Sequence, residues 1–216
     1  MIKAVLFDMD GTIIDTEKYY NKAWIMAHHD CGYMDYSFDD ALYQRSLNHE
    51  DSKKLWFSRY GKNYNWDMVH TKVSSYVDEM IKNKGIDTKP GLNEILAYLS
   101  DNNIKAAVVT ATNIDAAKRR LTLAGIQDRF EIIISASHVK KGKPHPDVYE
   151  HAARQLGLTP DECIAVEDSP NGVRSAYDAG CKVIMIPDLS EPDETTKPLL
   201  YARCDSLSDI IDILDN

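Results

Sequence analysis

The sequence predicts an α/β protein in which a doubly wound parallel sheet core, Rossmann-like, carries an inserted all-helical cap domain. One observation is a nearly continuous apolar run at residues 2–7, typical of a strand buried on both faces. Another is the alternation of short apolar runs with helical patterns after Pro90, which indicates parallel strands covered by helices. Between them lies a segment rich in Tyr, Trp, His and Asn without a convincing strand. We therefore expect residues 1–15 and 89–216 to form the core and residues 16–88 the cap.

The elements can be placed in chain order from their periodicity. After the strand at 2–7, apolar residues at helical spacing predict cap helices at about 17–30, 38–47, 50–60 and 66–84. The stretch from Lys84 to Gly91 contains glycine and proline and is typical of a linker or turn. Beyond it we expect helices at about 91–101, 114–124, 146–156, 170–178 and 206–214, alternating with strands at 105–109, 131–134, 163–166 and 182–186.

The composition indicates an ordinary globular protein. The chain has 216 residues, of which 44% are hydrophobic and 27% charged, enough for one sizeable domain or a domain with a smaller insertion. No apolar run approaches the roughly 18 residues of a membrane span, and Asp8 interrupts the N-terminal run too early for a signal peptide. The four cysteines lack metal-ligand spacing. We therefore expect a cytoplasmic protein with reduced thiols and no membrane partner, as a monomer or weak dimer.

The net charge of −9 restricts the possible partners. Binding a nucleic-acid backbone requires clustered Lys and Arg, so we expect no nucleic-acid partner. An anionic small molecule would need a local cation to offset the acidic surroundings. Magnesium is the obvious candidate, because hard oxygen ligands are plentiful in this sequence.

Polar clusters follow four of the expected strands. Ligands bind at the carboxyl ends of the strands in such sheets, near a topological switch point. The clusters are Asp8-Met9-Asp10-Gly11-Thr12, Thr110-Ala111-Thr112-Asn113, Lys143-Pro144-His145-Pro146-Asp147 and Glu167-Asp168-Ser169-Pro170-Asn171-Gly172.

Each cluster also has a purely structural interpretation. Asp10-Gly11 between apolar stretches favours a hairpin turn. Thr112 or Asn113 could simply cap a helix, as could Asp168 or Ser169. Lys143 could be a solvated loop lysine. A calcium-loop interpretation fails, because an EF-hand needs glycine at its sixth position and glutamate at its twelfth. Independent helix caps, however, need not supply a nucleophile, a hydroxyl, a cation and metal ligands in one place.

The segments FDMDGT, VVTAT, GKPHPD and AVEDSPNG, in this order, resemble the four motifs of the haloacid dehalogenase superfamily. The resemblance covers nearly the whole chain and is closest to the β-phosphoglucomutase-like branch, which carries a helical cap between the first two motifs. It implies that Asp8 attacks phosphorus to form an aspartyl-phosphate. Asp10 would then protonate the departing alkoxide and later take a proton from water. Dehalogenases lack the second aspartate, so phosphoryl transfer is expected.

The resemblance also implies roles for the other motifs. Asp8, Asp168 and the backbone carbonyl of Asp10 would hold Mg²⁺, while Glu167 would steady Lys143 or a metal-bound water. Lys143 would be the fixed cation beside the phosphoryl group. The Thr110 hydroxyl and the Ala111 amide would hold phosphate oxygens, near the positive end of a helix beginning at Asn113.

The cap is expected to close over the site and select the substrate, a small phosphate ester. Thr16 and the linker at 84–91 are possible hinges. Candidate contacts to the leaving group are Tyr20, Trp24, Arg45, His49 and Trp56, although the two tryptophans also suit a cap core.

Two cap positions bear on the reaction. Tyr20 stands where the mutase has a histidine, and His49 where it has an arginine that grips a second phosphate. We therefore favour a magnesium-dependent phosphatase for sugar-phosphate or nucleotide-type monoesters. A hexose-phosphate mutase and a catalytically silent phosphate-binding domain remain as alternatives.

Overall fold

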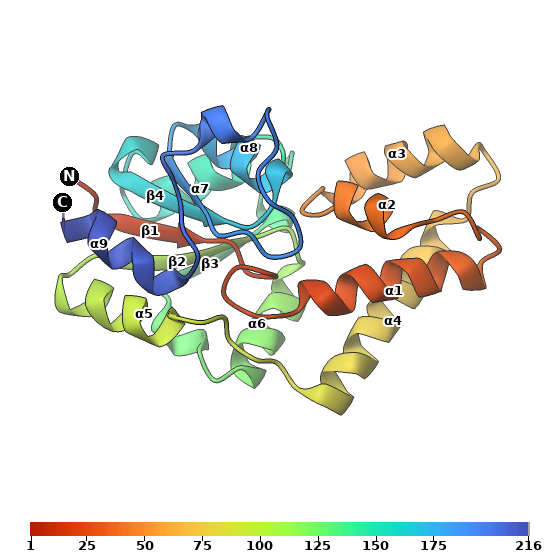
Figure 1. Cartoon of the computed structure of the whole chain (residues 1–216), viewed down its shortest axis with the longest axis horizontal. Helices are drawn as coiled ribbons and strands as arrows, with labels where there is room; N and C mark the ends of the chain where they lie inside the picture. Colours follow the sequence, from red (N-terminus) through yellow and green to blue (C-terminus); the bar gives the residue numbers. More distant parts are fainter. Residues whose placement is uncertain (216) are drawn as a thin grey trace.

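The computed structural model describes residues 1–215, and Figure 1 shows a core built on a sheet beside a group of helices. The sheet is parallel, with the strand order β3-β2-β1-β4-β5-β6. In chain order the strands are β1 (Ala4–Phe7), β2 (Lys105–Thr110), β3 (Ile132–Ser135), β4 (Cys163–Glu167), β5 (Lys182–Met185) and β6 (Ala202–Arg203). The predicted doubly wound α/β fold is confirmed.

Helices cover both faces of this sheet because its strands are apolar on both sides. On β1, Val5 and Phe7 join one hydrophobic cluster and Ala4 and Leu6 join the other, and all four are fully buried. The first cluster includes residues of α5 (Leu92–Asp101), α6 (Ile114–Leu123) and α9 (Ile210–Asp215). The second includes residues of α7 (Asp147–Gln155) and α8 (Pro170–Ala179). The two clusters account for the continuous hydrophobicity of the strand.

The helices between β1 and α5 form a third hydrophobic cluster of their own. They are α1 (Glu17–Asp30), α2 (Phe38–Tyr43), α3 (His49–Tyr60) and α4 (Trp66–Lys84). Figure 1 shows α1 and α4 crossing beneath α2 and α3. The cluster is largely aromatic, and at its centre His28 stacks on Tyr36 with ring centroids 3.6 Å apart. We call this group of helices the cap.

The chain enters and leaves the cap at the same place on the core. Ile14 forms an isolated antiparallel bridge with Thr88. The amide of Asp15 donates to the carbonyl of Asp87 at 2.9 Å, and that of Lys89 to Ile13 at 3.0 Å. The two connecting segments therefore run side by side.

Some element boundaries differ from the sequence prediction. Helix α2 ends at Tyr43, and not near residue 47, because Ser46 adopts a left-handed backbone with φ +58° that a helix cannot contain. The closing helix at 206–214 is a short 3₁₀ turn, Leu207–Asp209, followed by α9. The first strand begins at Ala4, two residues later than expected. The edge strand β6 was not predicted, since two residues are too few to show a period.

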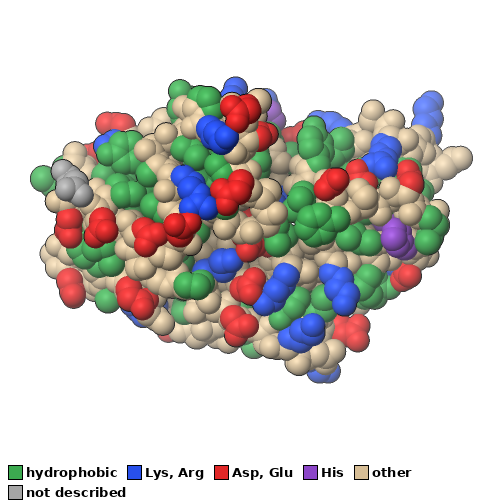
Figure 2. Space-filling model, viewed as in Figure 1, with side chains coloured by type: hydrophobic (Ala, Val, Ile, Leu, Met, Phe, Trp, Pro, Cys, Tyr) green, Lys and Arg blue, Asp and Glu red, His purple; other side chains and the backbone are tan. Residues whose placement is uncertain are grey.

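The surface agrees with the composition. On the face shown in Figure 2, Asp and Glu side chains are interspersed with Lys and Arg, and no continuous basic surface is seen there. All four cysteines are free. Within residues 1–215, no helix is both long enough and apolar enough to cross a bilayer.

Candidate active site

The parallel register brings the ends of three central strands to one edge of the sheet. Phe7 of β1 pairs with Val108 of β2 and with Val166 of β4. Asp8, Thr110 and Glu167 therefore follow at nearly the same level. All three are at least 97% buried. The polar groups expected at these strand ends therefore lie together at one edge of the sheet.

Lys143 links two of these strand ends. Its side chain is fully buried, and its ammonium group donates to Asp8 Oδ1 at 2.6 Å, to Glu167 Oε1 at 2.5 Å and to the carbonyl of Val109 at 3.0 Å. Burial alone would lower the pKa of Lys143, but the two carboxylates outweigh it and raise that pKa. Lys143 is therefore a fixed cation beside Asp8, and it is not a solvated loop lysine.

Two glycines of the motifs make room for the carboxylates. A Cβ atom at Gly172 would lie 1.9 Å from Glu167 Oε2. At Gly11 a Cβ would lie 2.5 Å from Asp168 Oδ2, and the φ of +87° there also favours glycine. The glycines of DMDG and SPNG thus let the backbone approach the acidic side chains closely.

Asp8, Glu167 and Asp168 form a group that could hold a metal ion. Each offers a carboxylate oxygen, and these oxygens lie within 4.8 Å of one another. Glu167 Oε2 and Asp168 Oδ1 are buried without a hydrogen-bond partner among residues 1–215. Burial raises the pKa of Asp8 well above its usual range, and it raises that of Asp168 to about 7. Buried, unpartnered carboxylate oxygens of this kind fit a hard divalent cation.

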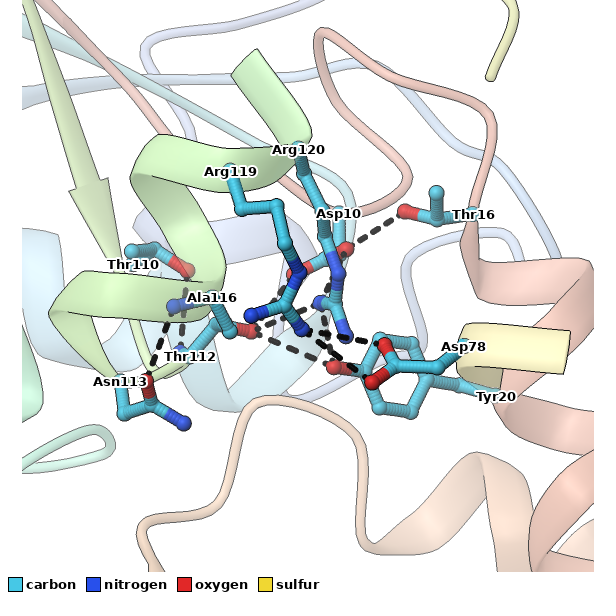
Figure 3. Close-up of polar contacts among 10 residues, drawn as sticks. All are labelled: Asp10, Thr16, Tyr20, Asp78, Thr110, Thr112, Asn113, Ala116, Arg119 and Arg120. Atoms are coloured by element: carbon cyan, nitrogen blue, oxygen red, sulfur yellow. Dashed lines mark hydrogen bonds and ion pairs between the residues drawn. The ribbon is translucent and has the colours of Figure 1, made fainter. Parts of the chain in front are cut away.

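The Asp10 carboxylate is not part of this group and has its own polar partners, which Figure 3 shows. Thr16 donates to Asp10 Oδ1 at 2.5 Å, and Thr112 donates to Asp10 Oδ2 at 2.8 Å. Arg120 on α6 lies 3.3 Å from Oδ1 and also donates to the Tyr20 hydroxyl. Asp10 is therefore oriented by groups from both the core and the cap.

Thr112 and Arg120 were not assigned roles from the sequence. Thr112 lies inside the second motif, where the sequence predicts only a possible helix cap for it. Arg120 is 96% buried and is 110 residues from Asp10 along the chain. The sequence offers one indication of a role for Arg120. It is a charged residue on the apolar side of the helix that begins at the second motif.

Two of the predicted helix-capping residues, Asn113 and Ser169, do cap helices, and they do so within the polar clusters. Asn113 caps α6, its side chain accepting from the amide of Ala116 at 3.0 Å. Ser169 caps α8, with Pro170 at the first helical position. The structural and the functional interpretations of these motifs are therefore compatible.

The predicted cap residues lie in different surroundings. The Tyr20 hydroxyl contacts Thr112 and Arg120, two side chains that also contact Asp10. Arg45 is buried against the acidic cluster, 3.1 Å from Asp168 Oδ2 and 2.7 Å from Ser190 Oγ. His49 is half exposed, and its Nε2 accepts from the indole of Trp66 at 2.7 Å. Trp24 lines the cavity described below, whereas Trp56 belongs to the cap core and not to the site.

The segment between α2 and α3 lies on the core beside the acidic cluster. The amide of Asn48 donates to the carbonyl of Lys143 at 3.0 Å, and the Asn171 side chain donates to the carbonyl of Arg45 at 2.8 Å. A Cβ at Gly142 would lie 2.8 Å from Asn48 Cβ. This cap segment therefore contacts the core directly. Between the cap helices and the core lies a cavity of about 440 Å³ lined by Asp8, Asp10 and Thr110.

Comparisons with known proteins agree with this arrangement. A family model described as haloacid dehalogenase-like hydrolase matches residues 5–186. Hexitol phosphatase A of Escherichia coli K12 is 32% identical over 209 residues, covering 88% of each chain. Beta-phosphoglucomutase of Bacillus subtilis is 31% identical over 188 residues, covering 83% of this chain and 80% of its own.

Solved structures show the same fold. A beta-phosphoglucomutase from Clostridium difficile has a TM-score of 0.84 at 24% identity, covering 100% of this chain and 96% of its own. CbbY from Rhodobacter sphaeroides in complex with xylulose-(1,5)bisphosphate has a TM-score of 0.80 at 24% identity, covering 97% and 96%.

Proposed function

The chain belongs to the haloacid dehalogenase-like hydrolase family, and on this premise we propose that it is a magnesium-dependent phosphatase. It hydrolyses small phosphate monoesters, of the sugar-phosphate or nucleotide type, through an aspartyl-phosphate intermediate. The observation that carries the proposal is the pair of aspartates facing one cavity. Asp8 is paired with a buried lysine and belongs to a group of carboxylates that could hold a metal ion, while Asp10 has separate partners.

Asp8 is the nucleophile in this proposal. Lys143 holds its Oδ1, so we assign the attack on phosphorus to Oδ2. The new bond joins Asp8 to phosphorus while the bond from phosphorus to the leaving oxygen breaks. The Thr110 hydroxyl, the Ala111 amide and Lys143 stabilise the negative charge on the phosphoryl oxygens during this transfer.

Asp10 serves as acid and then as base. Its carboxylic acid gives a proton to the departing alkoxide, and the resulting carboxylate takes a proton from water. That water attacks the phosphorus atom, which releases inorganic phosphate and restores Asp8. Thr16, Thr112 and Arg120 hold the Asp10 side chain in one orientation for both steps.

The charges of the site support the metal assignment. The site contains five carboxylates but only three cations, which are Lys143, Arg45 and Arg120. All eight side chains are at least 92% buried. The five are Asp8, Asp10, Glu17, Glu167 and Asp168. A dianionic phosphate would add to this excess of negative charge. Asp8, Asp168 and the backbone carbonyl of Asp10 are the ligands we assign to Mg²⁺, which when bound offsets that charge and polarises the phosphoryl oxygens.

Hydrolysis is favoured over mutase chemistry by the cap. A mutase must hold a second phosphate while the intermediate turns around in the site. The Tyr20 hydroxyl accepts from Arg120, and His49 Nε2 accepts from the Trp66 indole, so neither residue takes the place of an arginine that grips a second phosphate. The mutase stays the second candidate, because a curated beta-phosphoglucomutase is 31% identical to this chain.

The test is turnover of a panel of esters by the purified protein with Mg²⁺. The panel contains p-nitrophenyl phosphate, sugar 1- and 6-phosphates and nucleoside monophosphates, and both released phosphate and isomerised sugar are measured. We expect phosphate release that falls by about 10⁴-fold or more in Asp8→Asn and disappears with a chelator. Asp15→Asn, an acidic residue outside the cavity that pairs with Lys18, is the matched control.

Two results would contradict this proposal. Undiminished turnover in a folded Asp8→Asn protein would remove the nucleophile assignment. Isomerisation of a sugar phosphate without phosphate release would establish the mutase instead.

A further inference from the structure

We propose that Tyr149 is a positioning residue for phosphoryl transfer. Its hydroxyl holds the Glu167 carboxylate, and this keeps the Lys143 ammonium group on Asp8. The inference rests on the proposed function, in which Asp8 is the nucleophile and Lys143 is the fixed cation beside it.

The buried face of α7 is apolar except for the Tyr149 hydroxyl. The other buried residues of this helix are Val148, Ala152 and Ala153, and Tyr149 is itself fully buried. A phenylalanine would fill the same volume without a hydroxyl group that needs a partner. The hydroxyl finds its partner in the active site, where it donates to Glu167 Oε1 at 2.5 Å.

The Lys143 ammonium group is shared between two carboxylates. It has three N–H groups and donates to Asp8 Oδ1, to Glu167 Oε1 and to the Val109 carbonyl. The Tyr149 ring also lies against it, with Nζ 5.2 Å from the ring centroid, a distance at which a cation–π contact is favourable. Tyr149 therefore contacts both members of the Lys143–Glu167 pair, the ammonium group through its ring and the carboxylate through its hydroxyl.

The hydroxyl influences how Lys143 is divided between these carboxylates. Glu167 Oε1 accepts from both Tyr149 and Lys143, whereas its Oε2 has no hydrogen-bond partner among residues 1–215. A carboxylate oxygen that accepts a second hydrogen bond attracts the ammonium group less strongly, because part of its charge is already offset. Without the hydroxyl, Glu167 would compete more strongly for Lys143. The ammonium group would then move away from Asp8 and from the phosphoryl oxygens that it stabilises.

Tyr149 acts through its neighbours and not on the substrate. Its side chain has no exposed surface, and the residue lies outside the set that lines the cavity between the cap and the core. A change at Tyr149 should therefore alter the rate of phosphoryl transfer and leave the binding of the ester unchanged. A role in packing alone would alter neither quantity in the folded protein.

Pre-steady-state kinetics test this inference with Tyr149→Phe, which removes the hydroxyl and keeps the ring. The ester is the member of the panel that wild type hydrolyses fastest, and the burst of alcohol release is measured. We expect the rate constant at saturating ester to fall about 10-fold, as for the loss of one hydrogen bond to a charged group. The half-saturating concentration should stay the same. Tyr149→Met, which also removes the ring, should be slower still, and it is the second variant in case Tyr149→Phe does not fold.

Two matched variants separate this effect from a loss of packing. Val148→Ala removes buried methyl groups from the same helix, and Tyr177→Phe removes the hydroxyl of a tyrosine on α8 that is 47% exposed. Both should transfer the phosphoryl group at the wild-type rate. An unchanged rate in a folded Tyr149→Phe protein would overturn the inference, as would an equal fall in Val148→Ala. A wild-type rate at saturation with a raised half-saturating concentration would also overturn it.

Binding of orthovanadate gives a readout that does not depend on turnover, because vanadate adopts the five-coordinate geometry of a phosphoryl group in transfer. With Mg²⁺ present, we expect Tyr149→Phe to weaken vanadate binding about 10-fold and phosphate binding less than about twofold, since only the former resembles the transition state. Failure of the proposed function would look different, since no ester would then release phosphate from wild type, and the vanadate comparison would still test Tyr149. An equal effect on both ligands, or a wild-type protein that binds neither, would overturn the inference.

Discussion

The Glu167 carboxylate is confined by the residues around it. One of its oxygens accepts from Lys143 and Tyr149, and the other lies where a side chain at Gly172 would be. The carboxylate is therefore held between a buried cation and the backbone of α8. This contact explains why a helix that needs good helix formers has glycine in its first turn.

Gly172→Ala should reveal this contact. In an ordinary helix, glycine to alanine stabilises by up to about 1 kcal/mol. Here the added methyl group would overlap Glu167, and we expect a destabilisation of about 1–3 kcal/mol together with a loss of turnover, because Glu167 would move away from Lys143. Denaturant unfolding and phosphate release measure the two effects.

Arg174→Ala, an exposed position on the same helix paired only with Asp178 among the described residues, is the control for that substitution. A stabilised and fully active Gly172→Ala protein would show that Glu167 is not confined as the structure indicates.

The residues of the site differ in how far the sequence could predict them. Asp8, Thr110 and Asp168 follow directly from strand ends, since parallel topology alone brings those ends together. Arg120 could not be found in this way. It reaches Asp10 because α6 packs on the sheet, which is a consequence of tertiary packing and not of local pattern.

Among the elements, α1 is the one that connects the cap core to the site. Its first turns carry Tyr20 and Asn21 toward the cavity, whereas His28 near its end lies among the aromatic rings of the cap. His28 Nδ1 donates to the carbonyl of Trp24, and its Nε2 lies 2.7 Å from the Tyr64 hydroxyl, from which a neutral imidazole accepts. Both contacts are satisfied by a neutral imidazole.

His28 should make the stability of the protein depend on pH. Burial lowers its pKa from 6.5 to about 4, so between these values the unfolded chain binds the proton and the folded one does not. The contribution is fully present above pH 6.5 and is lost as the pH falls toward 4. It amounts to roughly 3 kcal/mol over this window.

The difference in unfolding free energy between wild type and His28→Gln, measured from pH 7 to pH 4, isolates this effect. We expect the wild type to lose more stability than the variant over that range. The partly exposed neighbour His29 provides the control, as His29→Gln. Parallel pH profiles for wild type and His28→Gln would contradict the assignment of a neutral His28.

The limits of prediction from sequence differ between elements. The long helices α1 and α4 were placed within about one residue because their apolar period extends over several turns. The end of α2 was missed, since the turn at Ser46 is imposed by contacts between the cap and the core, such as that of Ser46 with Ser169. Such long-range contacts leave no periodic signal in the chain.

At the scale of the whole molecule, the site concentrates negative charge inside an already acidic protein. The excess of carboxylates over cations in the core opposes folding unless protons or a cation compensate for it. A ligand that binds only the folded state stabilises it by mass action. Metal binding and stability should therefore be linked.

We expect Mg²⁺ to raise the unfolding temperature. At about 100 times its dissociation constant the stabilisation is about 2.7 kcal/mol, or roughly 5–10 °C for a chain of this size. A chelator should reverse the shift. Asp168→Asn should abolish it, whereas Asp128→Asn at an exposed position should not. An equal shift in wild type and Asp168→Asn would place the bound ion elsewhere.

The adjacent entry and exit of the cap have a consequence for how such proteins diversify. Because Ile14 and Thr88 are bridged, the core chain is nearly continuous without the segment between them. An exchange of that segment between relatives would therefore require only two cut points, which are neighbours in the structure. In such a chimera the choice of alcohol would come from the donor of the segment, and the phosphoryl chemistry from the recipient.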